Sequence, residues 1–350
     1  MRTLFWEDHH LKMIDQRILP GRFEIVSLRG HRAVAQSIQD MTVRGAPAIG
    51  AAAAFGLALA GFESRADSPP GLLADLRAAS ALLKSARPTA VNLAWAVERV
   101  MAVVERAKEE RGADELRQLI LDEAQRIADE DVQVNRRMAE HGAALIADGD
   151  TIIHHCNTGA LATVDWGTAL GVIRTAHEQG KRIHVLVDET RPRLQGARLT
   201  AWELEQYGIP YEIISDNMSG HFLRTGQAQK VLFGADRVAA NGDAANKIGT
   251  YMLALAAHAN QVPVYAVVPT STVDLSLAHG GLIPIEERDP AEVLGIQFQG
   301  EPVAPKQARA RNPAFDVTPH ALLTGIVTEN GVACPPFEVN LKKLVSRGAE

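Results

Sequence analysis

The chain has 350 residues, 46% of them hydrophobic and 22% charged, and its formal net charge is −6. This composition is typical of a globular protein with room for two domains, and the absence of a basic excess argues against nucleic acid or an anionic membrane as a partner. Two cysteines far apart in the sequence give no disulfide framework. They are typical of a reducing compartment, so we expect a cytoplasmic protein.

Residues 1–147 predict a mainly helical N-terminal domain. The apolar, Ala- and Gly-rich run 47–62 is too short to span a membrane comfortably, and it predicts a buried helix over 47–61. Apolar residues recur at helical spacing over 72–85 and 89–111. A long helix is expected over 114–146, with Asp114 as its N-cap. Asp148-Gly149-Asp150 then separates this mainly helical part from a part in which short strand-like runs alternate with helical stretches.

Residues 148–350 predict an α/β domain. Short β-branched runs alternate with helical stretches, a pattern typical of a parallel sheet covered by helices on both faces. Residues 284–313 are irregular, and 317–328 predict a closing helix and strand. The expected strands are 151–155, 183–187, 211–214, 231–233 and 264–268, and the expected helices between them include 165–179, 197–207 and 247–259.

Cys156 is the most informative residue of the chain. It follows the expected strand 151–155, and Asn157-Thr158-Gly159 predict a tight turn into a helix. The thiol would then lie at the carboxyl end of a strand, beside the N–H groups that open a helix. Open α/β sheets bind ligands at such a place, and the pKa of a thiol can be lowered there. A buried core thiol is the usual state of a free cysteine, but this context favours a function. Cys334 has no comparable context.

Polar side chains also follow the other expected strands. Parallel strands would bring Cys156, the segment 188–192, the segment 234–237 and the hydroxyls of 270–272 to one edge of the sheet. Asp236 follows an apolar run, with Gly234 beside it, and an apolar pocket would favour its neutral, proton-donating form. Asp236 could instead pair with Arg237 or cap a helix. Its expected place at the same edge as Cys156 favours the acid.

A second strong segment precedes the buried helix. Gly45 and Ala46 leave backbone N–H groups uncovered just before Pro47. Arg44 adds a positively charged guanidinium group that can donate two parallel hydrogen bonds, so the segment suits a phosphate group. A plain tight turn is the alternative. Other donors that suit a sugar phosphate are Arg87 before a proline, Gln195 after a strand end, and Asn246 and Lys247, which are expected to open a helix.

Several common sites are missing from the sequence. It has no phosphate-binding loop of the G-x-x-x-x-G-K-[ST] type, no G-x-G-x-x-G after a strand and no G-x-S-x-G. It also lacks His-x-x-x-His and Cys-x-x-Cys spacings. His154 and His155 would point to opposite faces of a strand, which argues against a shared metal ion. We therefore expect no metal site.

Six segments, in order and spanning nearly the whole chain, resemble the methylthioribose-1-phosphate isomerase family of the initiation factor 2B-like superfamily. Each segment alone is weak, but the ordered set is specific. The segments are TVRGAPAIG at 42–50, HCNTG at 155–159, ETRP at 189–192, GADR at 234–237, NKIGT at 246–250 and NPAFDVTP at 312–319.

The resemblance implies a helical N-terminal domain, a Rossmann-like C-terminal domain, a homodimer and no cofactor. It also implies conversion of 5-methylthioribose 1-phosphate to 5-methylthioribulose 1-phosphate in methionine salvage. Asp236 would be the proton donor, and Cys156 the base or transition-state stabiliser. The residues that would hold the substrate are Arg44, Gly45, Ala46, Arg87, Gln195, Asn246 and Lys247.

Two alternatives within the superfamily stay open. An isomerase of ribose 1,5-bisphosphate would need a second phosphate site, whereas a methylthio group needs an apolar pocket, which the Ala-rich helix after Arg44 favours. A regulatory subunit of an initiation factor 2B-like complex would share the fold and act by binding. Such a subunit would have no need of a cysteine and an acid at neighbouring strand ends.

Overall fold

The computed structural model describes residues 1–88 and 90–347. The chain divides into two compact units. The first comprises residues 1–136 together with 159–167, and the second comprises 137–158 together with 168–350. The boundary predicted at residue 147 lies inside the second unit, and the short segment 159–167 leaves that unit to join the first.

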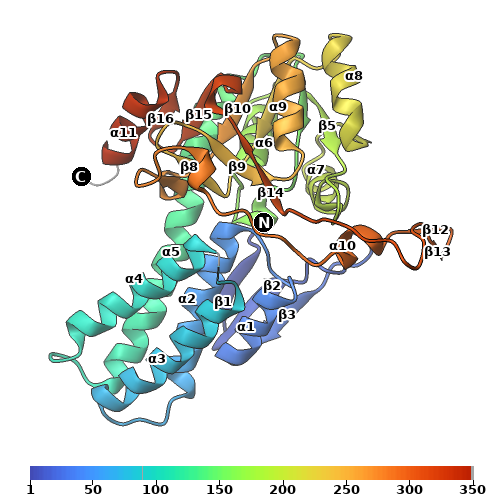
Figure 1. The fold of residues 1–350 in the computed structure, drawn as a ribbon. Coiled ribbons are helices and arrows are strands. Elements are labelled where there is room, and N and C mark those ends of the chain that lie inside the picture. The colour runs from blue at the N-terminus through green and yellow to red at the C-terminus, as the bar shows by residue number, and fades with distance from the viewer. Residues whose placement is uncertain (89, 348–350) are drawn as a thin grey trace. The chain divides into compact units, whose positions relative to one another are not determined.

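The first unit combines helices with a small sheet that the sequence analysis missed. Among the described residues this sheet has three antiparallel strands in the order β1-β2-β3. Its elements in chain order are β1 (Leu4–Glu7), β2 (His10–Ile14), β3 (Ile25–Leu28), α1 (His31–Gln39), α2 (Ala46–Glu63), α3 (Pro69–Ala86), α4 (Val91–Ala107) and α5 (Ala113–Ala143), which continues into the second unit (Figure 1).

Helix α2 is the core of the first unit, as the sequence predicts. It packs against α1, α3 and α4, and its residues 48–61 are all buried. In the described part of the chain, α2 is the one helix long and apolar enough to cross a membrane, but 78% of that stretch is buried inside the protein. Small residues allow this close packing, since a Cβ added at Gly56 would come within 3.0 Å of Leu83.

The second unit is built on a parallel sheet, which confirms the predicted fold class. Among the described residues the sheet has seven strands in the order β16-β15-β10-β7-β4-β5-β6, all parallel to their neighbours except β16. Its strands are β4 (Thr151–His154), β5 (His184–Asp188), β6 (Tyr211–Ile214), β7 (Lys230–Phe233), β10 (Val264–Val267), β15 (Gly325–Thr328) and β16 (Gly331–Ala333).

Helices α6 (Ala169–Glu178) and α9 (Thr250–Ala259) both pack against β7 at the middle of this sheet. A smaller sheet has the order β11-β8-β9-β14 within the described residues. The second unit also contains α7 (Ala201–Gln206), α8 (Ser219–Arg224), β8 (Arg237–Ala239), β9 (Ala244–Lys247), β11 (Val273–Asp274), α10 (Ala291–Leu294), β12 (Gln297–Phe298), β13 (Glu301–Pro302), β14 (Phe315–Thr318) and α11 (Phe337–Arg347).

Three local expectations are wrong. The helix expected over 165–179 begins only at Ala169, and the helix expected from Lys247 begins at Thr250. The helix expected near residue 317 is instead strand β14, which pairs with β9. In the last two cases the segments form the paired strands β9 and β14 although their apolar residues recur at helical spacing, because the pairing satisfies the backbone hydrogen-bonding groups of both segments.

Candidate active site

The strand ends meet as predicted. Strands β10, β7, β4 and β5 are consecutive and parallel, so their carboxyl ends lie on one edge of the sheet. In the register of the central pair, His154 of β4 lies opposite Leu232 of β7. Cys156 and Asp236 each follow one of these adjacent strands by a few residues, so their backbones leave the sheet at neighbouring positions.

The surroundings of Cys156 differ from the prediction in one respect. No tight turn leads into a helix here: a short 3-10 helix spans Ala160–Ala162, and α6 begins only at Ala169. The segment that follows Cys156 therefore supplies only a single short helical turn near the thiol. Instead, the backbone N–H of Cys156 donates to Thr190 Oγ1 at 2.8 Å, and its carbonyl accepts from Thr200 Oγ1 at 2.7 Å.

The backbone of Cys156 is held in an unusual conformation. Its φ is +72°, in the left-handed region that residues other than glycine rarely adopt, and Thr190, which accepts its N–H, has φ +59°. Such conformations cost about 1–3 kcal/mol each, and they concentrate at functional sites where surrounding contacts hold them in place. Two strained residues bonded to each other at a strand edge therefore support a function for this turn.

The structure brings Gln195 and Cys156 together. Gln195 Nε2 donates to Cys156 Sγ at 3.4 Å, and both side chains are buried. The other amide atom of Gln195, Oε1, is buried and has no hydrogen-bond partner among the described residues. Gln195 directly precedes a π-helical turn, Gly196–Thr200, that runs into α7. Such turns frequently occur at functional sites.

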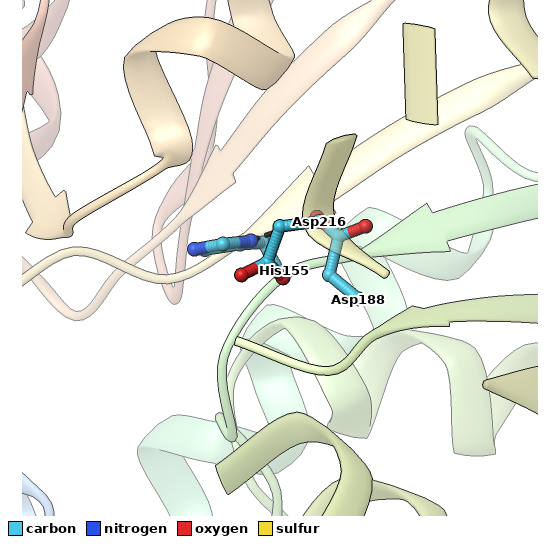
Figure 2. A group of neighbouring side chains, drawn as sticks. All are labelled: His155, Asp188 and Asp216. Carbon is cyan, nitrogen blue, oxygen red and sulfur yellow. Dashed lines mark hydrogen bonds and ion pairs between the residues drawn. The ribbon is translucent and has the colours of Figure 1, made fainter. Parts of the chain in front are cut away.

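Next to Cys156, the buried His155 is hydrogen-bonded to the buried Asp188, and the partly buried Asp216 lies close to both (Figure 2). Its Nδ1 lies 2.7 Å from Asp188 Oδ2, at the end of β5, and its Nε2 lies 3.0 Å from the Ile248 carbonyl oxygen. Ser219 Oγ donates to the other oxygen of Asp188. Asp216 accepts the N–H groups of Thr190 and of the residue after it at 2.7 and 2.8 Å.

This network has the residue types of a metal site, because ligand atoms of His155, Asp188 and Asp216 lie within 4.8 Å of one another. Hydrogen bonds nevertheless account for its arrangement. Both ring nitrogens of His155 face protein oxygens, and the Asp216 carboxylate faces two backbone N–H groups. A metal ion would need these same lone pairs, so the geometry favours a structural network over a metal centre.

The two consecutive histidines have opposite charge preferences. Burial lowers the pKa of His154 to about 3, so this ring is neutral. Its Nδ1 donates to the Leu232 carbonyl at 3.0 Å. Burial also works against a charge on His155, but the hydrogen bond and the negative charge of Asp188, together with further anionic neighbours, raise the pKa of His155 to about 9. Both histidines are hydrogen-bonded core residues on opposite sides of one strand.

The position of Asp236 corrects one expectation. Its backbone N–H donates to the Ala245 carbonyl at 2.9 Å, which joins it to β9, but its side chain is exposed. Within the described residues, the Asp236 side chain is therefore open to solvent and is not enclosed by apolar groups. Gly234 is required for tight packing, since an added Cβ would come within 2.9 Å of Thr158. The role of Asp236 as proton donor stays a prediction.

Asn246 and Lys247 lie at the end of β9 and do not open a helix, which corrects the prediction. Asn246 is buried, and its Nδ2 donates to Thr250 Oγ1 at 3.0 Å. The Lys247 ammonium lies 4.3 Å from the centre of the Phe315 ring. Strand β9 pairs with β8, which begins directly after Asp236, so the backbones of Asn246 and Lys247 pass beside the backbone of Asp236.

The remaining predicted residues belong to the first unit. Gly45 caps α2 with φ +97°, and Pro47 lies in the first turn of the helix as predicted. An added Cβ at Gly45 would overlap the backbone of Ala162, so glycine is required there. Arg44 and Ala46 flank this cap and are partly buried, and Arg87 forms the C-cap of α3.

The model of the initiation factor 2 subunit family matches residues 42–335, which is most of the chain. The chain belongs to this family. Methylthioribose-1-phosphate isomerases of Acetivibrio thermocellus and of a Synechococcus species are 50% and 52% identical to it. Each alignment covers 98% of this chain, and it covers 99% and 98% of the two relatives.

Solved structures of the initiation factor 2 subunit family give the same fold under two descriptions. The 5-methylthioribose 1-phosphate isomerase of Pyrococcus horikoshii matches with a TM-score of 0.93 and 47% identity over 99% of this chain and 96% of that one. A structure described as translation initiation factor eIF-2B, subunit delta, from A. fulgidus matches with a TM-score of 0.89 and 43% identity over 99% of both chains. Membership of the family therefore does not by itself select catalysis over binding.

Sequence reasoning placed the segment 188–192, with Asp188 and Thr190, at the same sheet edge as Cys156, but it did not predict that these residues, His155 and Thr200 would support the turn at Cys156. A weak signal was present, because His155 and Asp188 are charged residues next to apolar strand runs that the sequence predicts to be buried. Buried charges are rare unless they are paired. His155 and Asp188 could therefore have been proposed as partners of each other, but nothing in the sequence pattern points to Thr200.

Proposed function

We propose that the chain is an aldose–ketose isomerase that converts 5-methylthioribose 1-phosphate to 5-methylthioribulose 1-phosphate in methionine salvage. One observation carries the proposal: relatives at about half identity over nearly the full length of both chains bear this name. The placement of Cys156 in a strained, hydrogen-bonded turn at the ligand-binding edge of the sheet supports it. We also propose that the enzyme works without a cofactor, as a cytoplasmic homodimer.

The substrate explains why an acid is needed. Its anomeric oxygen carries the phosphate, so the ring cannot open to a free aldehyde in the way that ordinary aldoses do. Cleavage of the bond between C1 and the ring oxygen requires a proton on that oxygen, and we assign its delivery to Asp236. Because the Asp236 side chain is exposed, the substrate itself would have to exclude water from the carboxyl group when it binds.

Hydrogen must then move from C2 to C1. In one route Cys156, as a thiolate, removes the C2 proton to give an enol, and the thiol then returns a proton to C1 while the C2 hydroxyl loses its own proton. In the other route hydride shifts directly from C2 to C1 while the C2 hydroxyl loses its proton. The burial of Cys156 favours the direct shift, since a water-poor environment supplies few exchangeable protons. Reaction in deuterium oxide separates the routes, because rich incorporation at C1 excludes a pure hydride shift.

We assign substrate binding to a set of cationic and amide groups. Gln195, with an unpartnered buried carbonyl oxygen beside the thiol, is the best supported of them. Such an oxygen accepts a hydrogen bond from a bound hydroxyl and would otherwise cost about 1–3 kcal/mol. The other members, whose roles rest on the sequence, are Arg44, Gly45, Ala46, Arg87, Asn246 and Lys247.

Turnover by the purified chain tests the proposal. We expect conversion of 5-methylthioribose 1-phosphate, and little conversion of ribose 1,5-bisphosphate, whose second phosphate has no assigned site. Preferred turnover of the bisphosphate would instead support that isomerase. The A. fulgidus match supports a binding subunit as the second candidate, and that reading predicts no turnover of either sugar phosphate.

A further inference from the structure

We propose that His155 is a positioning residue of this reaction: a buried imidazolium that fixes the end of β4, and Cys156 with it, to the turn that follows Asn246 and Lys247. The inference rests on the proposed function and names a residue that acts through its neighbours. His155 bonds to Asp188, in the segment that leads to Gln195, and to Ile248, which directly follows Asn246 and Lys247.

The hydrogen-bond geometry assigns the charge. Nδ1 faces a carboxylate oxygen of Asp188 at 2.7 Å, and Nε2 faces the Ile248 carbonyl oxygen at 3.0 Å. A backbone carbonyl is only an acceptor, so Nε2 carries a hydrogen. Nδ1 faces the Asp188 carboxyl group, and the negative charge of Asp188 and of the neighbouring anionic groups favours the second hydrogen on this ring nitrogen. A ring that donates from both nitrogens is an imidazolium.

The turn that His155 holds is shaped to fit the ring. Gly249, directly after Ile248, has φ +104°, and an added Cβ would come within 2.9 Å of His155 Cε1. The backbone therefore passes flat against the imidazole edge. On its other side the turn is held by Asp316, which accepts the N–H groups of Gly249 and Tyr251 at 2.7 and 3.1 Å. The ring thus completes a turn fixed from both sides.

The charged groups around the ring favour the cation. Asp188 on β5, Asp216 after β6 and Asp316 on β14 all interact with it, as does Cys156 on its own segment, whereas His154 is neutral. Asp188 bonds to the ring directly. The carboxylates, and the Cys156 sulfur when it is ionised, stabilise the positive charge, so the cation persists to about pH 9, the raised pKa of His155.

The consequence for catalysis is geometric. Cys156 holds a strained backbone, which persists only where its neighbours fix it. The backbone N–H of Cys156 is bonded to Thr190. The residue before Cys156 is His155 itself, and its ring is anchored to the Ile248 carbonyl. Misplacement of a reacting group by about 1 Å can cost a factor of about 100 in rate. Loss of the N–H at Nε2 would release Ile248, which directly follows β9.

Ring nitrogen NMR of the whole protein labelled with 15N at histidine tests the charge directly. We expect both nitrogens of His155 to show protonated shifts at pH 7, with the His155→Gln variant assigning the signals. One protonated and one unprotonated nitrogen at pH 7 would overturn the proposal, because a neutral ring cannot donate to both partners. This result does not depend on which substrate the protein converts.

Kinetics of Asp188→Asn test the positioning role. The amide keeps the shape of the carboxylate but cannot stabilise the cation, so we expect kcat to fall and the alkaline limb of the kcat profile to move down by about one pH unit or more. His184→Gln is the matched control, because His184 begins the same strand and pairs with Glu212 at the surface. Its profile should match that of the wild type.

The two possible failures are distinguishable. If Asp188→Asn turns over as fast as the wild type and the alkaline limb of its kcat profile does not move, the positioning role alone is overturned. An inactive wild-type protein would refute the proposed function, and the positioning role with it, even if the ring proved to be doubly protonated. Equal melting temperatures for Asp188→Asn and the wild type, with a displaced limb, would separate positioning from a loss of stability.

Discussion

At the scale of single residues, Cys156 and Cys334 have contrasting surroundings. Cys156 is buried and bonded through its N–H, its carbonyl group and its sulfur to three different side chains. Cys334 is exposed, and its backbone carbonyl accepts from Asn340. A functional thiol needs fixed partners, and only the first of these two cysteines has them. The sequence predicted this choice from strand and turn context alone.

We predict that Cys156→Ser lowers kcat by about 100-fold or more, because a hydroxyl is less acidic and less polarisable than a thiol and so is both a poorer base and a poorer stabiliser of the charge that develops in the transition state. The measurement is steady-state turnover of the purified variant, with circular dichroism to show that it is folded. Cys334→Ser is the control and should keep wild-type activity. A folded but inactive Cys334→Ser with an active Cys156→Ser would show that the other thiol is the functional one.

Asp131 offers a residue-scale test of stability. Burial raises the pKa of its carboxyl to about 7, although Asp131 Oδ2 accepts the Val164 N–H at 2.8 Å. The folded state therefore binds a proton more tightly than the unfolded state, and the contribution of Asp131 to stability is lost as pH rises from about 4 through 7. We predict that Asp131→Asn, whose amide oxygen can still accept, is more stable than the wild type at pH 8 by about 1 kcal/mol.

Urea unfolding at pH 5 and pH 8 measures this effect. The gain of Asp131→Asn should shrink at pH 5, where the wild-type carboxyl is already protonated. The control is Asp129→Asn, because Asp129 is half exposed and pairs with Arg2 at the surface. A gain that is the same at both pH values would contradict the assignment of a raised pKa.

At the scale of elements, the start of α2 depends on a close backbone contact. Gly45 combines φ +97° with a Cβ position that would overlap the backbone of Ala162. We predict that Gly45→Ala destabilises the protein by about 3 kcal/mol, since both strain and overlap must be relieved. Chemical unfolding followed by circular dichroism measures the change.

Gly21→Ala is the matched control in the same unit. Gly21 has no positive φ, and an added Cβ would meet only the Ile18 carbonyl oxygen at the ordinary distance of 3.6 Å. Its free energy of unfolding should stay close to that of the wild type. Equal effects of the two substitutions would mean that the contact with Ala162 is not tight.

The elements also show where sequence reasoning succeeds. The five strands whose bounds were predicted, β4, β5, β6, β7 and β10, lie within one residue of those bounds at each end, because β-branched runs bounded by turn residues are a local signal. The turn after Cys156 was wrong because residues 159–167 pack by long-range contacts. Thr3 Oγ1 donates to the Ala160 carbonyl, and Gln16 Nε2 donates to the Leu161 carbonyl. No local pattern reveals such partners.

The N-terminal sheet was missed for a related reason. Strands β1 and β2 are short and carry charged or polar residues, such as Glu7 and His10, at their ends. They are stabilised by pairing with each other and by packing of residues such as Leu4 and Leu11 in the core around α2. Cys156 and Asp236 follow adjacent parallel strands as the sequence predicts, but the exposure of Asp236 depends on tertiary packing that a sequence does not show.

At the scale of the whole molecule, the family contains proteins named as enzymes and proteins named as initiation factor subunits. The fold does not decide between them, so the distinction depends on the strand-edge residues. We predict that the chain sediments at twice its 37.7-kDa mass, as the proposed homodimer requires. Analytical ultracentrifugation at micromolar concentration measures this, and a monomer would contradict that part of the proposal.

The central claim is that the Cys156 sulfur and the Asp236 carboxyl serve one reaction from adjacent strands. A double-mutant cycle on turnover of 5-methylthioribose 1-phosphate, with Cys156→Ser, Asp236→Asn and the double variant, tests it most directly. We expect each single variant to lose about 100-fold or more in kcat, and the double variant to be little worse than the poorer single one, because both groups act in the same sequence of bond changes. Near-wild-type turnover by either folded single variant would contradict the claim.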